Sequence, residues 1–531
     1  MGTYVNPGNE GFAGIVSGEY IDKTGIIPLV SAVIGTPRKL VCSTRPRRFG
    51  KTFAAESLVA YYSCGCDSHA LFEGLDVSRH ISYEEHLNAY NLIRLDMTAF
   101  RDAPDVAKEV TRVLLPELRE LCPSAGMRDE GRIGEITSAL TDVVDATGRR
   151  FVFVIDEWDV PLRERRPRAA QEDWVFFLRL LFKNMTFTTK VVAAAYMTGI
   201  LPIVRYGTQS ALSDFREYTI LHPYALAPYV GLTDEEVKDL ALRYNMDISE
   251  LRQWYDGYEL PYYDAVAKSQ SRVHAYAPFS VVSACENHAV GPYWTSSEAF
   301  ESLRLYVDMD FDGLQQAIVQ VVGGASVKVD TGTFENDMHD VSSSDDVLTL
   351  LCHLGYLVYD GQSRTARVPN EEVRAELERA LKRSRHHEIA RIIRNSDALL
   401  AATWDMDEES VAKAIAAAHD EGCAPTFYNN EQALRAVIKS AYISAADRYA
   451  CIEELPSGRG IADVVYVPKR GDDAPALVIE LKWNRDRGAA MGQIRDRDYA
   501  QALRDWSGPI LLVGITYDAK SKVHSCRIEE T

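Results

Sequence analysis

The sequence lacks any apolar run long enough to cross a bilayer. The longest nearly apolar window, residues 191–204, is shorter than the roughly 20 residues that a spanning helix needs, and it contains Thr198, Gly199 and Pro202. The first residues of the chain also lack a basic stretch followed by an apolar one, which argues against a secretory signal peptide. We therefore expect a cytoplasmic protein that does not enter a membrane.

Cysteine is sparse and poorly spaced for metal or disulfide chemistry. The chain has nine cysteines, an odd number, and the only close pair is Cys64 and Cys66. A structural zinc site made of cysteine pairs needs a second pair, and the sequence has none. Reduced thiols, as in the cytoplasm, are the simplest explanation. The sequence also lacks a convincing internal repeat and a low-complexity tract.

Basic residues are fewer than acidic ones, and the net charge is −19. This charge disfavours nonspecific nucleic-acid binding by the whole surface. The excess acid lies in the first 425 residues, because residues 426–531 hold 15 Lys and Arg against 15 Asp and Glu. With 46% hydrophobic and 25% charged residues the composition is that of a soluble globular protein. At 531 residues the chain is too long for one core, so several domains are expected.

One stretch has the pattern of a phosphate-binding loop. Residues 45–52 read Arg-Pro-Arg-Arg-Phe-Gly-Lys-Thr. An apolar run at 39–44 precedes them and predicts a buried strand, and residues 53–59 predict the first turns of a helix. A strand, a tight loop that ends in Gly-Lys-Thr and a helix are the parts of a loop that binds nucleotide phosphates. The alternative is an ordinary strand-to-helix turn with a solvated lysine.

Each residue of the Gly-Lys-Thr tripeptide has a role in such a loop. Gly50 lets the backbone approach the phosphates, Lys51 neutralises the β and γ oxygens, and Thr52 ligates Mg²⁺. Arg45 departs from the general pattern, which has glycine at this position. We therefore expect ATP and magnesium as cofactors. The candidate cofactor-binding residues are Arg45, Arg47, Arg48, Phe49, Gly50, Lys51, Thr52, Asp156 and Thr198.

A second apolar run ends in carboxylates. Residues 151–155 predict a buried parallel strand, and Asp156 and Glu157 follow directly. An aspartate at this position holds Mg²⁺ in phosphate-loop ATPases, and an adjacent glutamate can act as the general base. Thr198 follows a third strand-like run, 190–196, and would sense the γ-phosphate. The alternative is a buried strand that simply ends in a polar loop.

The order of these segments predicts a mostly parallel sheet with helices on both faces. Strand-like runs near 39–44, 90–97, 151–156 and 190–196 alternate with helical segments, and a further strand is expected at 217–221. After residue 225 the pattern becomes helical, with a Thr233–Glu236 capping box.

Residues 324–345 predict a connecting loop rich in small and polar residues. A helix at 345–353 and a hairpin at 355–359 and 364–368 then suggest a winged-helix-like unit, or equally a small α+β packing unit. A long helical stretch fills 371–422. The expected domains are an AAA-like ATPase domain (1–225), a helical domain (226–325), the winged-helix-like unit (326–375), a helical connector (376–425) and an α/β domain (426–531).

The last hundred residues contain a second candidate site. Residues 460–467 and 476–482 predict two strands joined by a turn. Glu480 and Lys482 point to the same face of their strand, and a hairpin can bring Asp463 beside them. Asp463 and Glu480 could hold a divalent metal, and a metal-bound water with a neighbouring lysine could hydrolyse a nucleic-acid backbone. The alternative is a solvated strand edge with a salt bridge at Glu480.

This order, D-x16-E-x-K, resembles the PD-(D/E)XK nuclease superfamily. The resemblance extends to Glu431, which opens an expected helix at 430–441, and to Gln493, in a helix after Lys482. Residues 509–514 supply the next strand. The resemblance implies a catalytic set of Asp463, Glu480, Lys482, Glu431 and Gln493, to which the first site adds Glu157.

The whole chain resembles the bacterial AAA-ATPase-like proteins that carry a C-terminal PD-(D/E)XK nuclease domain. The motifs that carry this resemblance lie at 20–24, 45–52, 155–159, 197–203 and 254–258, and Arg45 belongs to the family pattern. The implied fold is α/β and multidomain: a P-loop domain with a parallel sheet, a helical and winged-helix-like middle, and a restriction-endonuclease-like α/β domain.

These observations favour an ATP-regulated, magnesium-dependent nuclease that acts on nucleic acid, with DNA favoured over RNA, in bacterial defence against foreign DNA. Two alternatives stay open: a binding or signalling ATPase whose nuclease fold is inactive, and a protein that binds nucleotide without turnover. Arg205 is a candidate arginine finger only by its proximity to Thr198. A homo-oligomer also stays open.

Overall fold

The computed structural model divides into two compact units. Residues 1–296, 329–364 and 369–372 form the first unit, and residues 297–328, 365–368 and 373–531 form the second. The residues that the structure describes are 2–125, 134–163, 168–203, 205–206, 209–210, 212–264, 268–294, 311, 313–332, 334, 341–382, 387–422, 431–442, 444–445, 448–457, 460–468, 473–483, 506, 508–518 and 520–531.

A five-stranded parallel sheet forms the centre of the first unit, as the sequence predicts. Its strands are β1 (Leu40–Thr44), β2 (Asn91–Asp96), β3 (Phe151–Asp156), β4 (Val192–Gly199) and β7 (Arg216–Tyr218). The spatial order is β2-β3-β4-β1-β7, so β4 lies between β1 and β3. All neighbouring strands run parallel. The carboxyl ends of β1, β3 and β4 therefore meet at one edge of the sheet.

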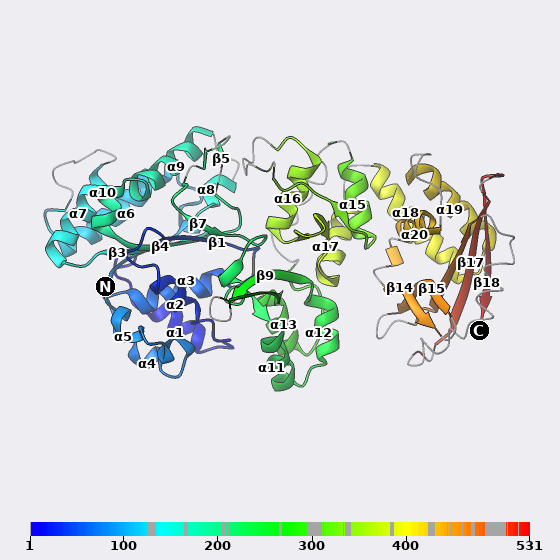
Figure 1. The fold of residues 1–531 in the computed structure, drawn as a ribbon, viewed down its shortest axis with the longest axis horizontal. Coiled ribbons are helices and arrows are strands. Elements are labelled where there is room, and N and C mark those ends of the chain that lie inside the picture. The colour runs from blue at the N-terminus through cyan, green and yellow to red at the C-terminus, as the bar shows by residue number, and fades with distance from the viewer. Residues whose placement is uncertain are drawn as a thin grey trace. The chain divides into compact units, whose positions relative to one another are not determined.

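Side chains of successive strand residues enter two separate cores, because they point to opposite faces. Phe151, Phe153 and Ile155 join one core, and Val152 and Val154 join the other. Figure 1 shows the helices that cover each face. One face carries α6 (Val106–Leu121), α7 (Glu135–Thr147), α9 (Arg168–Phe182) and α10 (Met185–Val191); the other carries α1 (Glu10–Val16), α2 (Ile26–Ser31), α3 (Lys51–Tyr62), α4 (His69–Phe72) and α5 (Tyr83–His86).

Short elements complete this part of the unit. They are the helix α8 (Val160–Arg163), the 3₁₀ turns η1 (Asp76–Arg79), η2 (Met97–Phe100) and η4 (Tyr224–Leu226), and the ribbon of β5 (Arg205–Tyr206) and β6 (Gln209–Ser210). Strand β7 begins one residue before the predicted 217–221 and ends three residues earlier, at Tyr218. Within the described residues, no helix is long and apolar enough to cross a membrane.

The segment after residue 225 contains a sheet that the sequence does not predict. Helices α11 (Asp234–Tyr244), α12 (Ile248–Tyr255) and α13 (Pro278–Asn287) accompany the strands β8 (Leu232–Thr233), β9 (Tyr258–Asp264) and β10 (Ser269–Tyr276). The expectation of helix alone is wrong here, because β9 contains Pro261 and the first half of β10 is polar and exposed. The apolar alternation of a half-buried strand is confined to short inner segments, at Tyr258 and Leu260 of β9 and at Val273 and Ala275 of β10. The capping box of Thr233 and Glu236 is present.

Helix α16 (Ser344–Leu354) and strand β12 (Val358–Asp360) also belong to the first unit. Gly355 ends α16 with a φ of +89°, a conformation that favours glycine. An added Cβ at Gly355 would lie 2.7 Å from the ring of Pro46, so the backbone at Gly355 packs directly on the loop of residues 45–50. The predicted helix at 345–353 is confirmed; the winged-helix-like interpretation stays a prediction.

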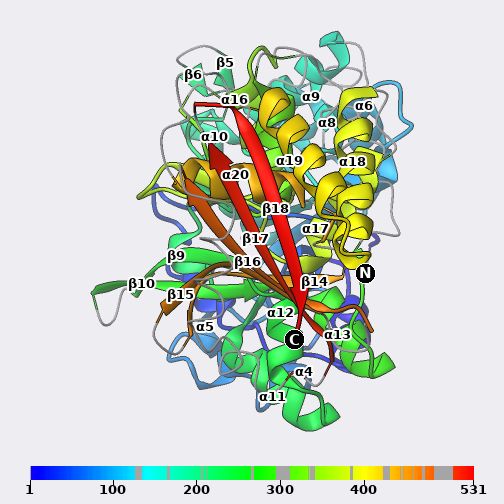
Figure 2. The ribbon, with the colours of Figure 1, turned by 90° about the vertical axis from the view of Figure 1, so that its right-hand side faces the viewer.

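The second unit contains a five-stranded mixed sheet. Its strands, in spatial order, are β14 (Tyr449–Ser457), β15 (Gly460–Pro468), β16 (Ala476–Trp483), β17 (Ile510–Asp518) and β18 (Val523–Glu530). β16 and β17 are parallel, and the other pairs are antiparallel. Figure 2 shows β16, β17 and β18 side by side.

Helices cover one face of this sheet. Leu399 of α18 (His387–Trp404), Ile415 of α19 (Glu408–Gly422) and Ile438 of α20 (Glu431–Ala441) share a core with Ile479 and Val513 of the strands. The predicted helical stretch 371–422 is helical but divided, since α17 (Glu371–Lys382) precedes α18 and α19. The remaining elements are α15 (Leu314–Val322), β11 (Val327–Lys328) and β13 (Thr365–Arg367), and β11 pairs with β13.

Candidate nucleotide-binding site

The loop of residues 45–50 is held in a left-handed backbone at two positions. Arg48 has a φ of +68° and Gly50 a φ of +82°. The side chains on either side of this turn are anchored: Phe49 is buried edge-on against Tyr258 at 5.2 Å, and the Arg48 guanidinium lies 3.9 Å from the ring centroid of Phe279. These contacts stabilise a backbone that a non-glycine residue adopts at a cost.

Lys51 begins helix α3 and turns back under the loop. Its Nζ donates to the carbonyl oxygen of Pro46 at 3.1 Å and lies 3.2 Å from Oε1 of Glu157. The lysine is 5% exposed, so it is not the solvated lysine of an ordinary turn. The ammonium group therefore sits between the loop backbone and the carboxylates at the end of β3.

Thr52 and Asp156 form the second contact between the loop and β3. The Thr52 hydroxyl donates to Oδ2 of Asp156 at 2.7 Å. Burial raises the pKa of Asp156 to about 6, although the hydrogen bond from Thr52 opposes this shift. A hydroxyl and a carboxylate side by side are oxygen donors of the kind that Mg²⁺ prefers. The two residues thus fit a magnesium ion bound together with phosphates.

Glu157 lies between two cations. Its carboxylate contacts Lys51 through Oε1 and Arg163, the last residue of α8, through Oε2. Burial favours the neutral acid, but the positive charges of Lys51 and Arg163 outweigh it and lower the pKa of Glu157. Glu157 also has a φ of +51°, which is strained for a non-glycine residue. Its carboxylate is therefore ionised and fixed at the carboxyl edge of the sheet.

Asp159 ties the end of β3 to the end of β4. The side chain is completely buried, and its Oδ2 accepts from the N–H groups of Ile200 at 3.1 Å and Leu201 at 2.8 Å. The N–H of Trp158 donates to the carbonyl of Thr198 at 2.9 Å. The motifs at 155–159 and 197–203 thus form one hydrogen-bonded unit. The Thr198 hydroxyl beside them is buried and has no hydrogen-bond partner within the described part of the chain.

Gly199 permits this close approach, and we expect Gly199→Ala to destabilise the first unit. An added Cβ would lie 2.8 Å from Cδ1 of Trp158 and 2.9 Å from Cγ of Asp159. Such overpacking costs about 1–3 kcal/mol, measurable as a lower midpoint in thermal or denaturant unfolding. Gly14→Ala on α1 is the matched control, because nothing lies within 4 Å of its added Cβ. Equal midpoints for the two variants would contradict the packing argument.

Arg45 does not lie on the open side of the loop. Its guanidinium is fully buried, and Nη1 donates to the carbonyls of Thr44 at 2.8 Å and Tyr218 at 3.0 Å. Its Nε and Nη2 have no hydrogen-bond partner among the described residues. Burial lowers the pKa of Arg45 to about 10, so the group stays charged at neutral pH. Arg45 joins β1 to β7 beneath the loop, and its contact with a cofactor stays a prediction.

The structure thus brings Gly50, Lys51, Thr52, Asp156 and Glu157 together at one edge of the sheet, with Thr198 at the end of the neighbouring strand. Arg47 lies close enough to Glu157 to help lower its pKa. The contact of Arg163 with Glu157 and Asp159 was not predicted from the sequence. The four-residue spacing of Asp159 and Arg163 is typical of an ion pair between successive helical turns. The contact of Arg163 with Glu157 depends in addition on the left-handed turn at Glu157. The side chain of Arg205 is outside the described residues.

The N-terminal motif at 20–24 has a structural role. Lys23 is partly buried, and its Nζ donates to the carbonyl of Pro228 at 2.7 Å and pairs with Glu236 at 2.5 Å. Glu236 also caps the first turn of α11 by accepting from the N–H of Thr233. This motif therefore ties the N-terminal segment to the start of α11.

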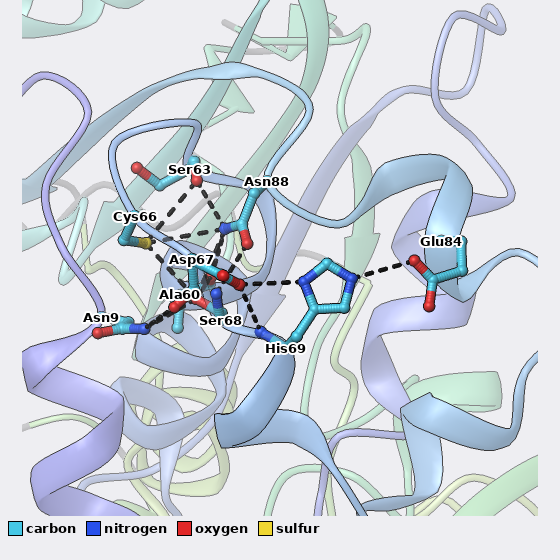
Figure 3. Close-up of polar contacts among 9 residues, drawn as sticks. All are labelled: Asn9, Ala60, Ser63, Cys66, Asp67, Ser68, His69, Glu84 and Asn88. Atoms are coloured by element: carbon cyan, nitrogen blue, oxygen red, sulfur yellow. Dashed lines mark hydrogen bonds and ion pairs between the residues drawn. The ribbon is translucent and has the colours of Figure 1, made fainter.

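A polar cluster near the end of α3 is also structural (Figure 3). Asn88 donates from Nδ2 to the carbonyls of Ala60 at 3.2 Å and Ser63 at 2.7 Å, and so satisfies carbonyls at the end of the helix. His69 beside it lies 3.0 Å from Asp67 and 3.1 Å from Glu84, all on the surface. These two carboxylates accept hydrogen bonds from the His69 ring and so raise the pKa of His69.

The C-terminal candidate residues lie on β15 and β16. Nζ of Lys482 is 3.4 Å from Oε1 of Glu480, and Asp463 accepts from the N–H of Leu481 at 2.9 Å. Arg435 of α20 pairs with Oδ1 of Asp463 at 2.7 Å. The three predicted residues are therefore neighbours, and all are buried. Within the described part of the chain, no group of three or more His, Cys, Asp or Glu could hold a metal ion.

Two members of the predicted C-terminal set are not placed. Glu431 is the first residue of α20, but its side chain is outside the described residues. Gln493 lies entirely outside them. Their roles stay predictions.

Comparison with known proteins finds a family match in the first part of the chain. Residues 8–208 match the model of a family described as predicted AAA-ATPase. A curated relative, the uncharacterized protein in the vnfD 5′ region of Azotobacter chroococcum mcd 1, is 25% identical over 548 residues that cover 97% of this chain and 96% of the relative. The match of residues 8–208 supports the sequence-based prediction of an AAA-ATPase-like domain. The family match ends before the C-terminal cluster.

Solved structures give weaker likenesses. The Walker-type ATPase PABY2304 of Pyrococcus abyssi is 12% identical, with 67% of this chain and 94% of that chain covered at a TM-score of 0.34. The ORC2 protein of Aeropyrum pernix, in its ADPNP–ADP complexes, is 11% identical, with 68% and 96% covered at a TM-score of 0.34.

Proposed function

We propose that the first unit binds ATP with Mg²⁺ and hydrolyses it. The observation that carries this proposal is the position of Lys51, whose Nζ lies 3.1 Å from the Pro46 carbonyl and 3.2 Å from Glu157. A buried ammonium under a left-handed loop, at the N-terminus of a helix, is suited to bind an anion. The match of residues 8–208 to an AAA-ATPase family supports a nucleotide as that anion.

The surrounding residues divide the chemistry between them. Lys51 and the N–H groups at the start of α3 bind the phosphates, and Thr52 and Asp156 would hold the Mg²⁺ that offsets their charge. Glu157 accepts a proton from the attacking water. The hydroxyl of Thr198, buried without a partner in the described structure, is available to hydrogen-bond the γ-phosphate or that water.

Glu157→Gln tests hydrolysis separately from binding. The amide keeps the shape of the side chain but accepts no proton, so we expect ATP to bind while kcat falls by about 10²- to 10⁴-fold. Titration calorimetry and phosphate release measure the two effects. Glu172→Gln, on the exposed face of α9, is the matched control. Phosphate release at the wild-type rate would remove Glu157 from the mechanism.

The second unit has a further candidate function, a metal-dependent nuclease. The observation that favours it is the contact of Glu480 with Lys482 at 3.4 Å, with Asp463 hydrogen-bonded to the intervening Leu481. Two carboxylates and a lysine in this arrangement could hold a metal ion and position a water at a phosphodiester. ATP turnover in the first unit would then regulate cleavage of nucleic acid, with DNA as the favoured substrate.

Incubation of the whole protein with plasmid DNA or RNA tests this second function. Mg²⁺ or Mn²⁺ is supplied, with and without ATP, and we expect metal-dependent cleavage that responds to ATP. Without cleavage under any of these conditions, the protein is a binding or signalling ATPase and the C-terminal residues are inactive.

A further inference from the structure

Glu157 is a buried carboxylate with two cationic partners. Lys51 lies 3.2 Å from Oε1, and Arg163 contacts Oε2. The side chains of Lys51, Arg163 and Glu157 are 5%, 14% and 18% exposed, so water screens these pairs poorly. The Glu157 carboxylate is thus shared between the cation at the start of α3 and a cation of α8.

Phosphate binding would change this arrangement. In the proposed reaction Lys51 must turn to the phosphates, because it is the cation that the loop aims at them. Glu157 would then lose one of its counter-charges while a more negative ligand arrives beside it. A buried charge left unpaired is costly, and this cost would oppose ATP binding.

Arg163 is anchored independently of the loop. Its Nε lies 2.9 Å from Oδ2 of Asp159, which is completely buried. The same Asp159 oxygen accepts from the N–H groups of Ile200 and Leu201 after β4. Arg163 is thus fixed to the sheet edge by contacts that do not involve Lys51.

We propose that Arg163 is a positioning residue for the ATPase reaction: it keeps Glu157 charge-compensated and in place when Lys51 leaves Glu157 for the phosphates of ATP. This inference rests on the proposed ATPase function. Beyond that function, Arg163 of α8 is the partner that allows Lys51 to leave Glu157 for the phosphates.

The test is a double-mutant cycle on ATP binding, measured by titration calorimetry with the full chain and Mg²⁺. Arg163→Ala should weaken ATP binding by about tenfold or more, because Glu157 then retains Lys51 as its nearest counter-charge. In a Glu157→Gln background the same change should have an effect below about twofold, since no carboxylate needs compensation. Arg163→Lys should recover part of the loss.

Controls separate this role from a structural one. Arg168→Ala removes an exposed ion pair with Glu172 on α9 and should leave ATP binding unchanged. If Arg163→Ala fails to fold, Arg163→Lys and Arg163→Gln in both backgrounds complete the cycle. Wild-type affinity in Arg163→Ala, or the same loss in both backgrounds, would overturn the inference. A wild-type protein that binds no ATP would instead overturn the proposed function, and this inference with it.

Discussion

Lys51→Ala is expected to weaken ATP binding by about 100-fold or more, while the protein stays folded. The lysine supplies the cation that the loop aims at the phosphates, and a hydrogen bond to a charged group contributes about 1.5–3 kcal/mol. The fold should survive, because Glu157 keeps its contact with Arg163 when Lys51 is removed. Titration calorimetry with ATP and Mg²⁺ measures the affinity, and thermal unfolding measures the stability.

Lys190→Ala is the matched control for this variant. It removes a lysine from the same unit, but one that is half exposed and paired with Asp145 on the surface. An exposed pair contributes little to stability, so affinity and unfolding midpoint should stay at wild-type values. Unchanged ATP affinity in Lys51→Ala would show that residues 45–52 are not a phosphate-binding loop.

Glu480→Ala is expected to abolish metal-dependent cleavage by the second unit. Glu480 is completely buried and contacts Lys482, so its removal would take away an oxygen ligand of the proposed metal ion and does take away the partner of the lysine. Asp463→Ala should have the same effect, whereas Lys482→Ala should lose cleavage and retain metal. Cleavage of plasmid DNA and calorimetric Mn²⁺ titration distinguish these outcomes.

Glu529→Ala on β18 is the control for the nuclease variants, since it removes a carboxylate of the same sheet that pairs with Arg527. It should cut nucleic acid at the wild-type rate. Because Glu480 is buried, each variant also needs an unfolding midpoint, and Glu480→Gln preserves the shape of the side chain if Glu480→Ala unfolds. Wild-type cleavage by folded Glu480→Gln and Asp463→Ala variants would exclude this site.

The central sheet of the first unit could be predicted because its strands are buried on both faces. A run such as Phe151–Ile155 is then apolar at every position and stands out in the sequence. The hairpin of β9 and β10 was not predicted, because its outer half is polar and exposed and the apolar alternation in its inner half is short. A strand could thus be predicted from the sequence where both of its faces are buried.

The candidate site was predictable to the same extent as the strands that carry it. Asp156 and Thr198 lie at the carboxyl ends of β3 and β4, Lys51 follows β1 through the loop, and the ends of parallel strands meet at one edge. The contact of Arg163 with Glu157 depends instead on the left-handed turn at Glu157, and no local sequence pattern predicts that turn. Arg45 occupies a position where phosphate contact is expected, yet its side chain turns into the sheet toward the carbonyl of Tyr218.

The packing of Gly355 on Pro46 links the loop to a residue encoded much later in the chain. Tyr258, which packs on Phe49, donates a hydrogen bond to the carbonyl of Gly355 at 2.6 Å, so both contacts belong to one assembly. During synthesis the ribosome must release the chain beyond residue 355 before this assembly can close around the loop. A fragment that ends at residue 225 would contain every residue of the phosphate-binding motif and yet lack the surface that holds it in shape.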